Sequence, residues 1–240
     1  MIRLGLPVED CLDRLKQCLS ERDEVVLEAP PGAGKTTLVP LALLDEGWLS
    51  GKKILMLEPR RIATKSAAHR MASLINELPG QTVGYRMRLD TKVSNQTRVE
   101  VITEGILTRM LQQDPSLEEV GLVIFDEFHE RNLDSDLALS LCLKGRTLFR
   151  DNQSPLKILI MSATLDSQAI AQLLNDAVIV SSAGKSYPVA INYGRASQPK
   201  ERIVDRMVAT IKQALLDNPH SSLLAFLPGQ GEIYRVAEAL

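Results

Sequence analysis

The sequence predicts an α/β fold built on a doubly wound, mainly parallel β-sheet. Short runs rich in Val, Ile and Leu recur along the chain, and each is followed by a longer stretch with helical periodicity. Runs that are apolar on both faces and alternate with helices are typical of a parallel sheet covered on both sides. Ligands of such sheets bind beyond the carboxyl ends of the strands. The predicted strands lie at 25–27, 54–57, 99–102, 122–125, 158–161 and 178–180.

Helices between these strands are predicted from the residues that start and stop them. One follows a glycine-rich turn, two end before the pairs Pro79-Gly80 and Asp114-Pro115, and one begins near Leu133. The predicted helices span 34–44, 62–78, 105–112 and 133–143.

The pattern changes after Val180, where the small residues Ser181 to Gly184 precede the pair Tyr187-Pro188. This loop-like composition predicts a first domain at 1–183 and a second region at 184–240. The second region is expected to hold an extended piece at 189–193, a helix at 201–216, a strand at 222–227 and the start of another helix. Two strands bury too little surface for a secure core, and the last helix reaches Leu240 without a stop signal. We therefore expect the natural chain to continue.

Composition excludes several classes of protein. The chain has 240 residues, of which 45% are hydrophobic and 24% charged, as in ordinary globular proteins. Its apolar runs are far shorter than the roughly 20 residues that cross a bilayer. Glu9 and Asp10 stand where a secretory signal would need an apolar segment. We expect a cytoplasmic protein with no membrane segment.

Cysteines and net charge point to no particular ligand. Cys11, Cys18 and Cys142 are too few and too scattered for a disulfide scaffold, and with the histidines they form no zinc pattern. We expect buried thiols and no structural metal. The formal net charge is −2. Because no overall positive field would attract a polyanion, any contact with nucleic acid must be local.

A phosphate-binding loop is predicted between a strand at 24–28 and a helix. Its sequence, Ala29-Pro-Pro-Gly-Ala-Gly-Lys-Thr-Thr37, departs from the strict P-loop pattern because Ala29 replaces a glycine. Glycines let backbone N–H groups surround an anion, and the helix adds its positive end. Lys35 is expected to hold the phosphates of ATP or another NTP, and Thr36 to bind Mg²⁺. The alternative is a glycine-rich turn without a ligand. The predicted nucleotide-binding residues are Pro31, Gly32, Ala33, Gly34, Lys35, Thr36 and Thr37.

An acidic pair follows the predicted strand at 120–125. Such a pair can reach the magnesium shell and the attacking water when its strand neighbours a P-loop. Asp126 and Glu127 are expected to bind Mg²⁺, partly through water, and Glu127 also to orient and deprotonate the attacking water. Taken alone, an acidic pair after an apolar run is more often a solvated strand end.

These motifs resemble those of the DEAH-box branch of superfamily 2 helicases. The resemblance is closest to the bacterial HrpB-like group, whose box also reads Asp-Glu-Phe-His, here Asp126 to His129. It covers essentially the whole chain and implies a first RecA-like domain followed by the start of a second. The further matching segments are Glu58-Pro59-Arg60-Arg61-Ile62-Ala63, Val83-Gly84-Tyr85-Arg86, Thr103-Glu104-Gly105, Ser162-Ala163-Thr164 and Phe226-Leu227-Pro228-Gly229.

The resemblance implies two further groups of site residues. The nucleic-acid-binding group contains Arg60, Arg61, Thr103, Glu104, Gly105 and Gly229. Guanidinium groups and helix N-termini suit phosphates, but the arginines could instead pair with carboxylates of the fold, and Thr103 could be a simple N-cap. The coupling group contains His129, Ser162, Ala163 and Thr164, and His129 is also counted with Lys35, Asp126 and Glu127 among the catalytic residues. Hydroxyls of that segment are expected to bond His129, which could otherwise be a structural histidine.

The function implied is an ATP-dependent RNA helicase that couples NTP hydrolysis to movement along single-stranded RNA or duplex unwinding. A DNA translocase and a nucleotide-gated scaffold without turnover remain alternatives, and protein partners are not indicated. Glu58 stands where eukaryotic members often have Gln. The family's later motifs, with arginines that reach the γ-phosphate, would lie beyond Leu240. We expect the present fragment to bind nucleotide but to hydrolyse it poorly.

Overall fold

The computed structural model describes residues 4–151, 154–163, 167–184, 188–196 and 201–240. Contacts divide the chain into two compact units, Met1–Ser186 and Tyr187–Leu240. This division lies close to the boundary expected at residue 184. Thr164, one of the predicted coupling residues, lies outside the described residues.

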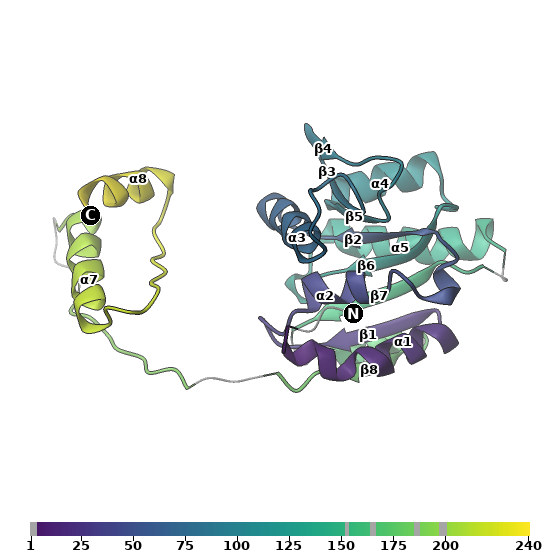
Figure 1. The fold of residues 1–240 in the computed structure, drawn as a ribbon, viewed down its shortest axis with the longest axis horizontal. Helices are drawn as coiled ribbons and strands as arrows, with labels where there is room; N and C mark the ends of the chain where they lie inside the picture. Colours follow the sequence, from purple (N-terminus) through teal and green to yellow (C-terminus); the bar gives the residue numbers. More distant parts are fainter. Residues whose placement is uncertain (1–3, 152–153, 164–166, 185–187, 197–200) are drawn as a thin grey trace. The chain divides into compact units, whose positions relative to one another are not determined.

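The first unit is built on one large sheet, drawn in Figure 1. Within the described residues it has eight strands in the order β4-β3-β5-β2-β6-β7-β1-β8. Neighbouring strands are parallel except in the β3–β4 hairpin, which confirms the predicted mainly parallel sheet. The strands are β1 Glu24–Glu28, β2 Lys53–Leu57, β3 Val83–Met87, β4 Asp90–Lys92, β5 Val99–Ile102, β6 Val120–Phe125, β7 Lys157–Ser162 and β8 Val178–Ser181.

Helices cover both faces of this sheet, as a doubly wound fold requires. One apolar core joins the sheet to α1, α2 and α3, and a second joins it to α4, α5 and α6. Alternate strand residues enter opposite cores, for example Leu27 one and Val26 the other. Figure 1 shows α1 to α3 in front of the sheet and α4 and α5 behind it. The helical elements are η1 Pro7–Cys11, α1 Leu12–Glu21, α2 Lys35–Ala42, η2 Gly47–Leu49, α3 Arg61–Leu74, α4 Glu104–Gln113, η3 Phe128–Glu130, α5 Leu133–Phe149 and α6 Ser167–Leu173.

The first unit differs from the sequence-based prediction in two places. Residues 83–86, noted only as a motif, form the first strand of a hairpin at the sheet edge. Helix α5 continues past its predicted end at residue 143 to Phe149. Position 145, inside this helix, requires glycine because a Cβ there would collide with the carbonyl oxygen of Pro115. The glycine therefore marks a close approach between two segments and not a helix end.

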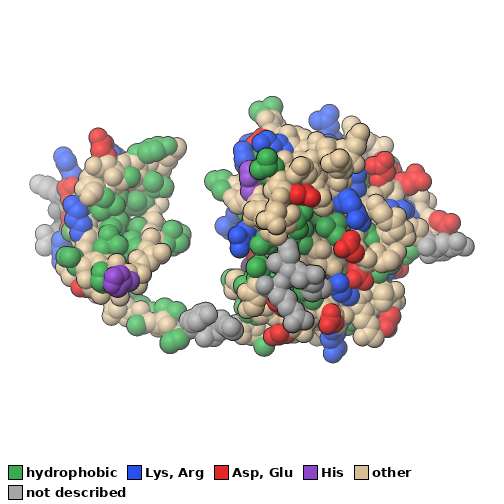
Figure 2. Space-filling model, in the orientation of Figure 1, with side chains coloured by type: hydrophobic (Ala, Val, Ile, Leu, Met, Phe, Trp, Pro, Cys, Tyr) green, Lys and Arg blue, Asp and Glu red, His purple; other side chains and the backbone are tan. Residues whose placement is uncertain are grey.

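The second unit contains α7 Ile203–Asp217 and α8 Gln230–Ala239. The strand predicted at 222–227 is wrong, since no strand forms at 188–196 or 201–240. A strand needs a hydrogen-bonded neighbour, and this described part offers none. Figure 2 shows apolar side chains gathered on one face of the unit. Its exposed apolar residues include Val189, Ile191, Tyr193, Leu224 and Phe226.

None of the helices in the described ranges is long and apolar enough to cross a membrane.

Candidate functional site

The glycine-rich loop connects β1 to α2 at the carboxyl edge of the sheet. Gly32 and Gly34 adopt left-handed φ angles of 77° and 93°, which favour glycine. Lys35 is the first residue of α2. The substituted position, Ala29, is buried, and its N–H donates to the carbonyl of Ser162 at 3.0 Å. The departure from the strict pattern therefore lies where the loop leaves the sheet, while the glycines that bend the loop are kept.

The N-terminal segment packs against this loop, which the motifs did not indicate. The N–H of Val8 donates to the carbonyl of Ala33 at 3.0 Å. A Cβ on Gly34 would lie 2.8 Å from Cδ1 of Leu6. Gly34 is thus constrained by its φ angle and by its neighbour, and the segment before α1 supports the loop from outside.

Thr36 and Asp126 meet directly, although they come from different strand–helix units. The Thr36 hydroxyl donates to Oδ2 of Asp126 at 2.5 Å, and the Asp126 N–H donates to the carbonyl of Leu57 at 3.0 Å. Burial raises the pKa of Asp126 to about 6, against the opposing hydrogen bond from Thr36. Hydroxyl and carboxylate oxygens are hard ligands of the kind that Mg²⁺ prefers. These two side chains fit the predicted magnesium site.

Lys35 and Glu127 form the second contact between the loop and the acidic strand end. Nζ of Lys35 lies 2.9 Å from Oε1 of Glu127. Lys35 is only 3% exposed, and a buried ammonium group requires such a partner. Glu127 has a φ of 49°, a conformation that costs a non-glycine residue on the order of 1–3 kcal/mol and often occurs at functional sites. Phosphate oxygens of a nucleotide could replace Glu127 as the partner of Lys35.

His129 lies between Glu127 and the end of β7. Its Nδ1 accepts the N–H of Ala163 at 3.4 Å and lies 3.4 Å from Oε2 of Glu127. We expected hydroxyls of Ser162 and Thr164 to bond His129, whereas this contact comes from the backbone of Ala163. The segment 162–163 nevertheless lies beside the acidic strand end, because β7 pairs with β6.

A cleft of about 420 Å³ opens beside Thr36 and Thr37. It is also lined by Glu58 and Arg70, to which sequence reasoning gave no role in nucleotide binding. No motif marks Arg70; it reaches the cleft because α3 packs on α2. Glu58 is buried, and its pKa is raised to about 8, first by burial and then by the negative charges of Asp126 and Glu127.

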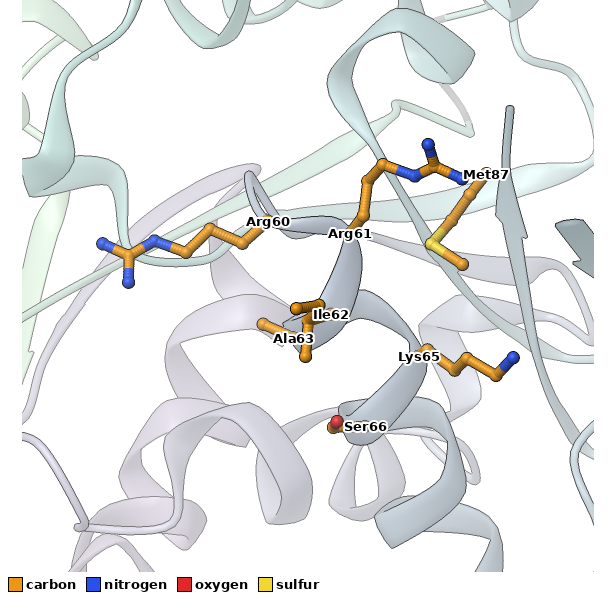
Figure 3. A pocket seen from close by; sticks show the side chains of 7 residues that line it. All are labelled: Arg60, Arg61, Ile62, Ala63, Lys65, Ser66 and Met87. Atoms are coloured by element: carbon orange, nitrogen blue, oxygen red, sulfur yellow. The ribbon is translucent and has the colours of Figure 1, made fainter. Parts of the chain in front are cut away.

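The two predicted arginines contact partners within the protein. Nη2 of Arg60 donates to Oε1 of Glu130 at 2.6 Å, and Nη2 of Arg61 donates to the carbonyl of Arg88 at 2.9 Å. Both line an open pocket with Lys65, and Figure 3 shows the Arg60 side chain extending away from Arg61 and Lys65. Arg60 therefore pairs with a carboxylate of the fold, which was the alternative to a nucleic-acid contact.

The other residues predicted to bind nucleic acid differ from one another in their contacts. Thr103 is the N-cap residue of α4 but makes no side-chain capping bond. Oε1 of Glu104 accepts from Nδ2 of Asn132 at 2.5 Å and from Oγ of Ser135 at 2.6 Å, so this carboxylate is engaged inside the fold. Space around Gly105 is open. Gly229, in the second unit, is the N-cap residue of α8.

Comparison with known proteins agrees with this arrangement. The chain is 50% identical over 236 residues to the ATP-dependent RNA helicase HrpB of Escherichia coli, covering 98% of the chain and 28% of that protein. It is 35% identical to the pre-mRNA-splicing factor ATP-dependent RNA helicase prp22 of Schizosaccharomyces pombe, covering 99% of the chain and 20% of that protein. The chain thus spans less than a third of the length of these curated relatives.

Solved structures give the same result. The crystal structure of the Escherichia coli DEAH/RHA helicase HrpB matches with a TM-score of 0.84 and 49% identity, over 97% of this chain and 29% of that one. The DEAD/DEAH box helicase family matches residues 12–173, a range that holds the P-loop, the acidic strand end and β7. With its P-loop joined to an Asp-Glu-Phe-His strand end, the chain belongs to the DEAD/DEAH box helicase family.

Proposed function

We propose that this chain is the nucleotide-hydrolysing part of an ATP-dependent RNA helicase. The observation that carries the proposal is the double contact between the P-loop and the acidic strand end. Thr36 bonds Asp126, and Lys35 pairs with Glu127. Phosphate-binding and water-activating groups are thus adjacent, which is what in-line phosphoryl transfer to water requires.

Each residue of this centre has a separate role in the proposed reaction. Lys35 and the loop N–H groups bind the β- and γ-phosphates, while Thr36 and Asp126 hold Mg²⁺. The metal, when bound, supplies positive charge against the phosphate oxygens. Glu127 takes a proton from the attacking water. At the same time the water oxygen bonds to the γ-phosphorus, and the bond between the γ-phosphorus and the oxygen that leaves with ADP breaks.

His129 and the segment Ser162, Ala163 and Thr164 are proposed to couple this centre to conformational change. The Nδ1 atom of His129 contacts both Glu127 and the Ala163 N–H. A shift of Glu127 on nucleotide binding would therefore move His129 and change its contact with Ala163 at the end of β7. Arg60, Arg61, Thr103, Gly105 and Gly229 are proposed to contact nucleic acid. We further expect this activity in the cytoplasm, where ATP and RNA both occur.

ATP hydrolysis by the full-length protein tests this function. Hydrolysis is measured alone, with single-stranded RNA and with DNA of equal sequence. We expect measurable turnover that RNA stimulates more strongly than DNA, since the relatives are named RNA helicases. Equal or greater stimulation by DNA would favour a translocase on DNA. ATP binding without turnover under any condition would instead favour a nucleotide-gated scaffold.

A further inference from the structure

The turn that follows Asp126 is held by a cation at each end. Glu127 precedes η3 and pairs with Lys35, while Glu130 ends η3 and pairs with Arg60. The N–H of Glu130 donates to the carbonyl of Glu127 at 2.9 Å, so the two glutamates belong to one hydrogen-bonded turn.

Each of these cations has a phosphate as its proposed partner. Lys35 is assigned to nucleotide phosphates, and Arg60 to nucleic-acid phosphates. Both now pair with a glutamate of the same turn, so either ligand must compete with a carboxylate for its cation. Arg60 is well placed for such an exchange, because its side chain is 71% exposed and Glu130 is 32% exposed. Arg60 lines both the open pocket of Figure 3 and the cleft beside Thr36.

A second predicted nucleic-acid segment holds the chain just beyond this turn. Glu104 accepts hydrogen bonds from Asn132 and Ser135 at the start of α5. Asn132 is itself the N-cap of α5, because its Oδ1 accepts the N–H of Ser135 at 2.8 Å. The segment that follows the turn is therefore fixed to α4, whereas the ion pair of Glu130 with Arg60 is exposed and can exchange its partner.

We propose that Glu130 is a positioning residue. Through it, nucleic-acid binding at Arg60 changes the position of Glu127. In the free protein, Glu130 occupies Arg60 and keeps the turn in its resting conformation, with Glu127 on Lys35. A nucleic-acid phosphate replaces Glu130 as the ion-pair partner of Arg60. Because Glu130 is then no longer restrained, the turn can move Glu127 toward the attacking water. This proposal rests on the proposed function and adds the contact through which RNA stimulates hydrolysis.

RNA affinity of the full-length protein gives a test that does not depend on turnover. Glu130→Gln removes the competing charge, so the Kd for a single-stranded RNA should fall by up to roughly fivefold, the largest change that an exposed ion pair supports. The gain should vanish in an Arg60→Gln background, which completes a double-mutant cycle. Asp136→Asn is the matched control, because Asp136 pairs at 2.9 Å with Arg131, also next to the turn, but not with Arg60.

Unchanged RNA affinity in Glu130→Gln would overturn the proposal. An equal gain in the Arg60→Gln background, or in Asp136→Asn, would also overturn it, because a general loss of negative charge would then explain the effect.

Hydrolysis supplies the second readout. Glu130→Gln should raise the rate without RNA several-fold and reduce the ratio of stimulated to unstimulated rates. A merely structural Glu130 would lower both rates, and that result would overturn the proposal. If wild-type protein hydrolyses ATP without any response to RNA, the proposed function itself fails. If the wild type responds to RNA and Glu130→Gln behaves identically, only the role of Glu130 fails.

Discussion

In the first unit, the residues proposed to bind nucleotide and those predicted to bind nucleic acid differ in what they contact. Lys35, Thr36, Asp126 and Glu127 contact one another across two loops. Arg60, by contrast, is paired with Glu130, and the Glu104 carboxylate is bonded to α5. The first group is thus paired within the site itself, whereas Arg60 and Glu104 are paired with residues outside the nucleotide site.

This difference follows from burial. Lys35 is 3% exposed and Asp126 4% exposed, and a buried charged group costs several kcal/mol unless it is paired. An exposed pair such as Arg60 with Glu130 contributes about 0.2–1 kcal/mol. Substitutions at the P-loop should therefore have large effects, and substitutions at the nucleic-acid side should have small ones.

The largest effect is expected for Glu127→Gln. The amide keeps the size of the side chain but cannot take a proton, so kcat should fall roughly 10²- to 10⁴-fold, the usual contribution of a general base. ATP binding should persist. Steady-state hydrolysis and a direct ATP-binding titration measure the two quantities, and unchanged turnover would remove Glu127 from the base role.

Lys35→Ala should act on binding. A hydrogen bond to a charged group contributes about 1.5–3 kcal/mol, so the Kd for ATP should rise roughly 10- to 100-fold. Titration of the variant with ATP and Mg²⁺ tests this. If Lys35→Ala and Glu127→Gln gave the same phenotype, the separate roles assigned to the two residues would not stand.

Glu58 should make stability depend on pH. Its pKa is raised from 4.5 to about 8 in the folded protein, so the folded state binds more protons than the unfolded state between these values. The free energy of unfolding should then fall as pH rises through this window, by at most about 1.4 kcal/mol per pH unit. Denaturant titrations of wild type and Glu58→Gln at several pH values measure the slope, which should flatten in the variant.

Glu104→Ala should have the smallest effect, and it should be on stability. Loss of the carboxylate leaves Asn132 and Ser135 without this acceptor, which costs about 1 kcal/mol or more. Glu104→Gln keeps an acceptor oxygen and should cost less. RNA affinity should change in neither variant. Weakened RNA binding at unchanged stability would show that Glu104 contacts nucleic acid after all.

Local patterns predicted the strands, the P-loop and the strand-end motif, because hydrophobic period and glycine spacing are written in neighbouring residues. Contacts between distant segments were not predictable. Sequence reasoning assigned no role at the site to Val8 or Arg70, because tertiary packing alone brings them there. It also gave none to Glu130, whose pairing with Arg60 joins segments 70 residues apart. The strand predicted at 222–227 is wrong for the same reason, since pairing depends on a neighbour and not on apolar composition.

The dependence of ATP hydrolysis on ATP concentration, with and without single-stranded RNA, tests the central claim most directly. If RNA acts on the turn that carries Glu127 and moves this residue toward the attacking water, RNA should raise kcat. A fall in KM at constant kcat would contradict the account, because RNA would then be completing the nucleotide site and not releasing its catalytic residue.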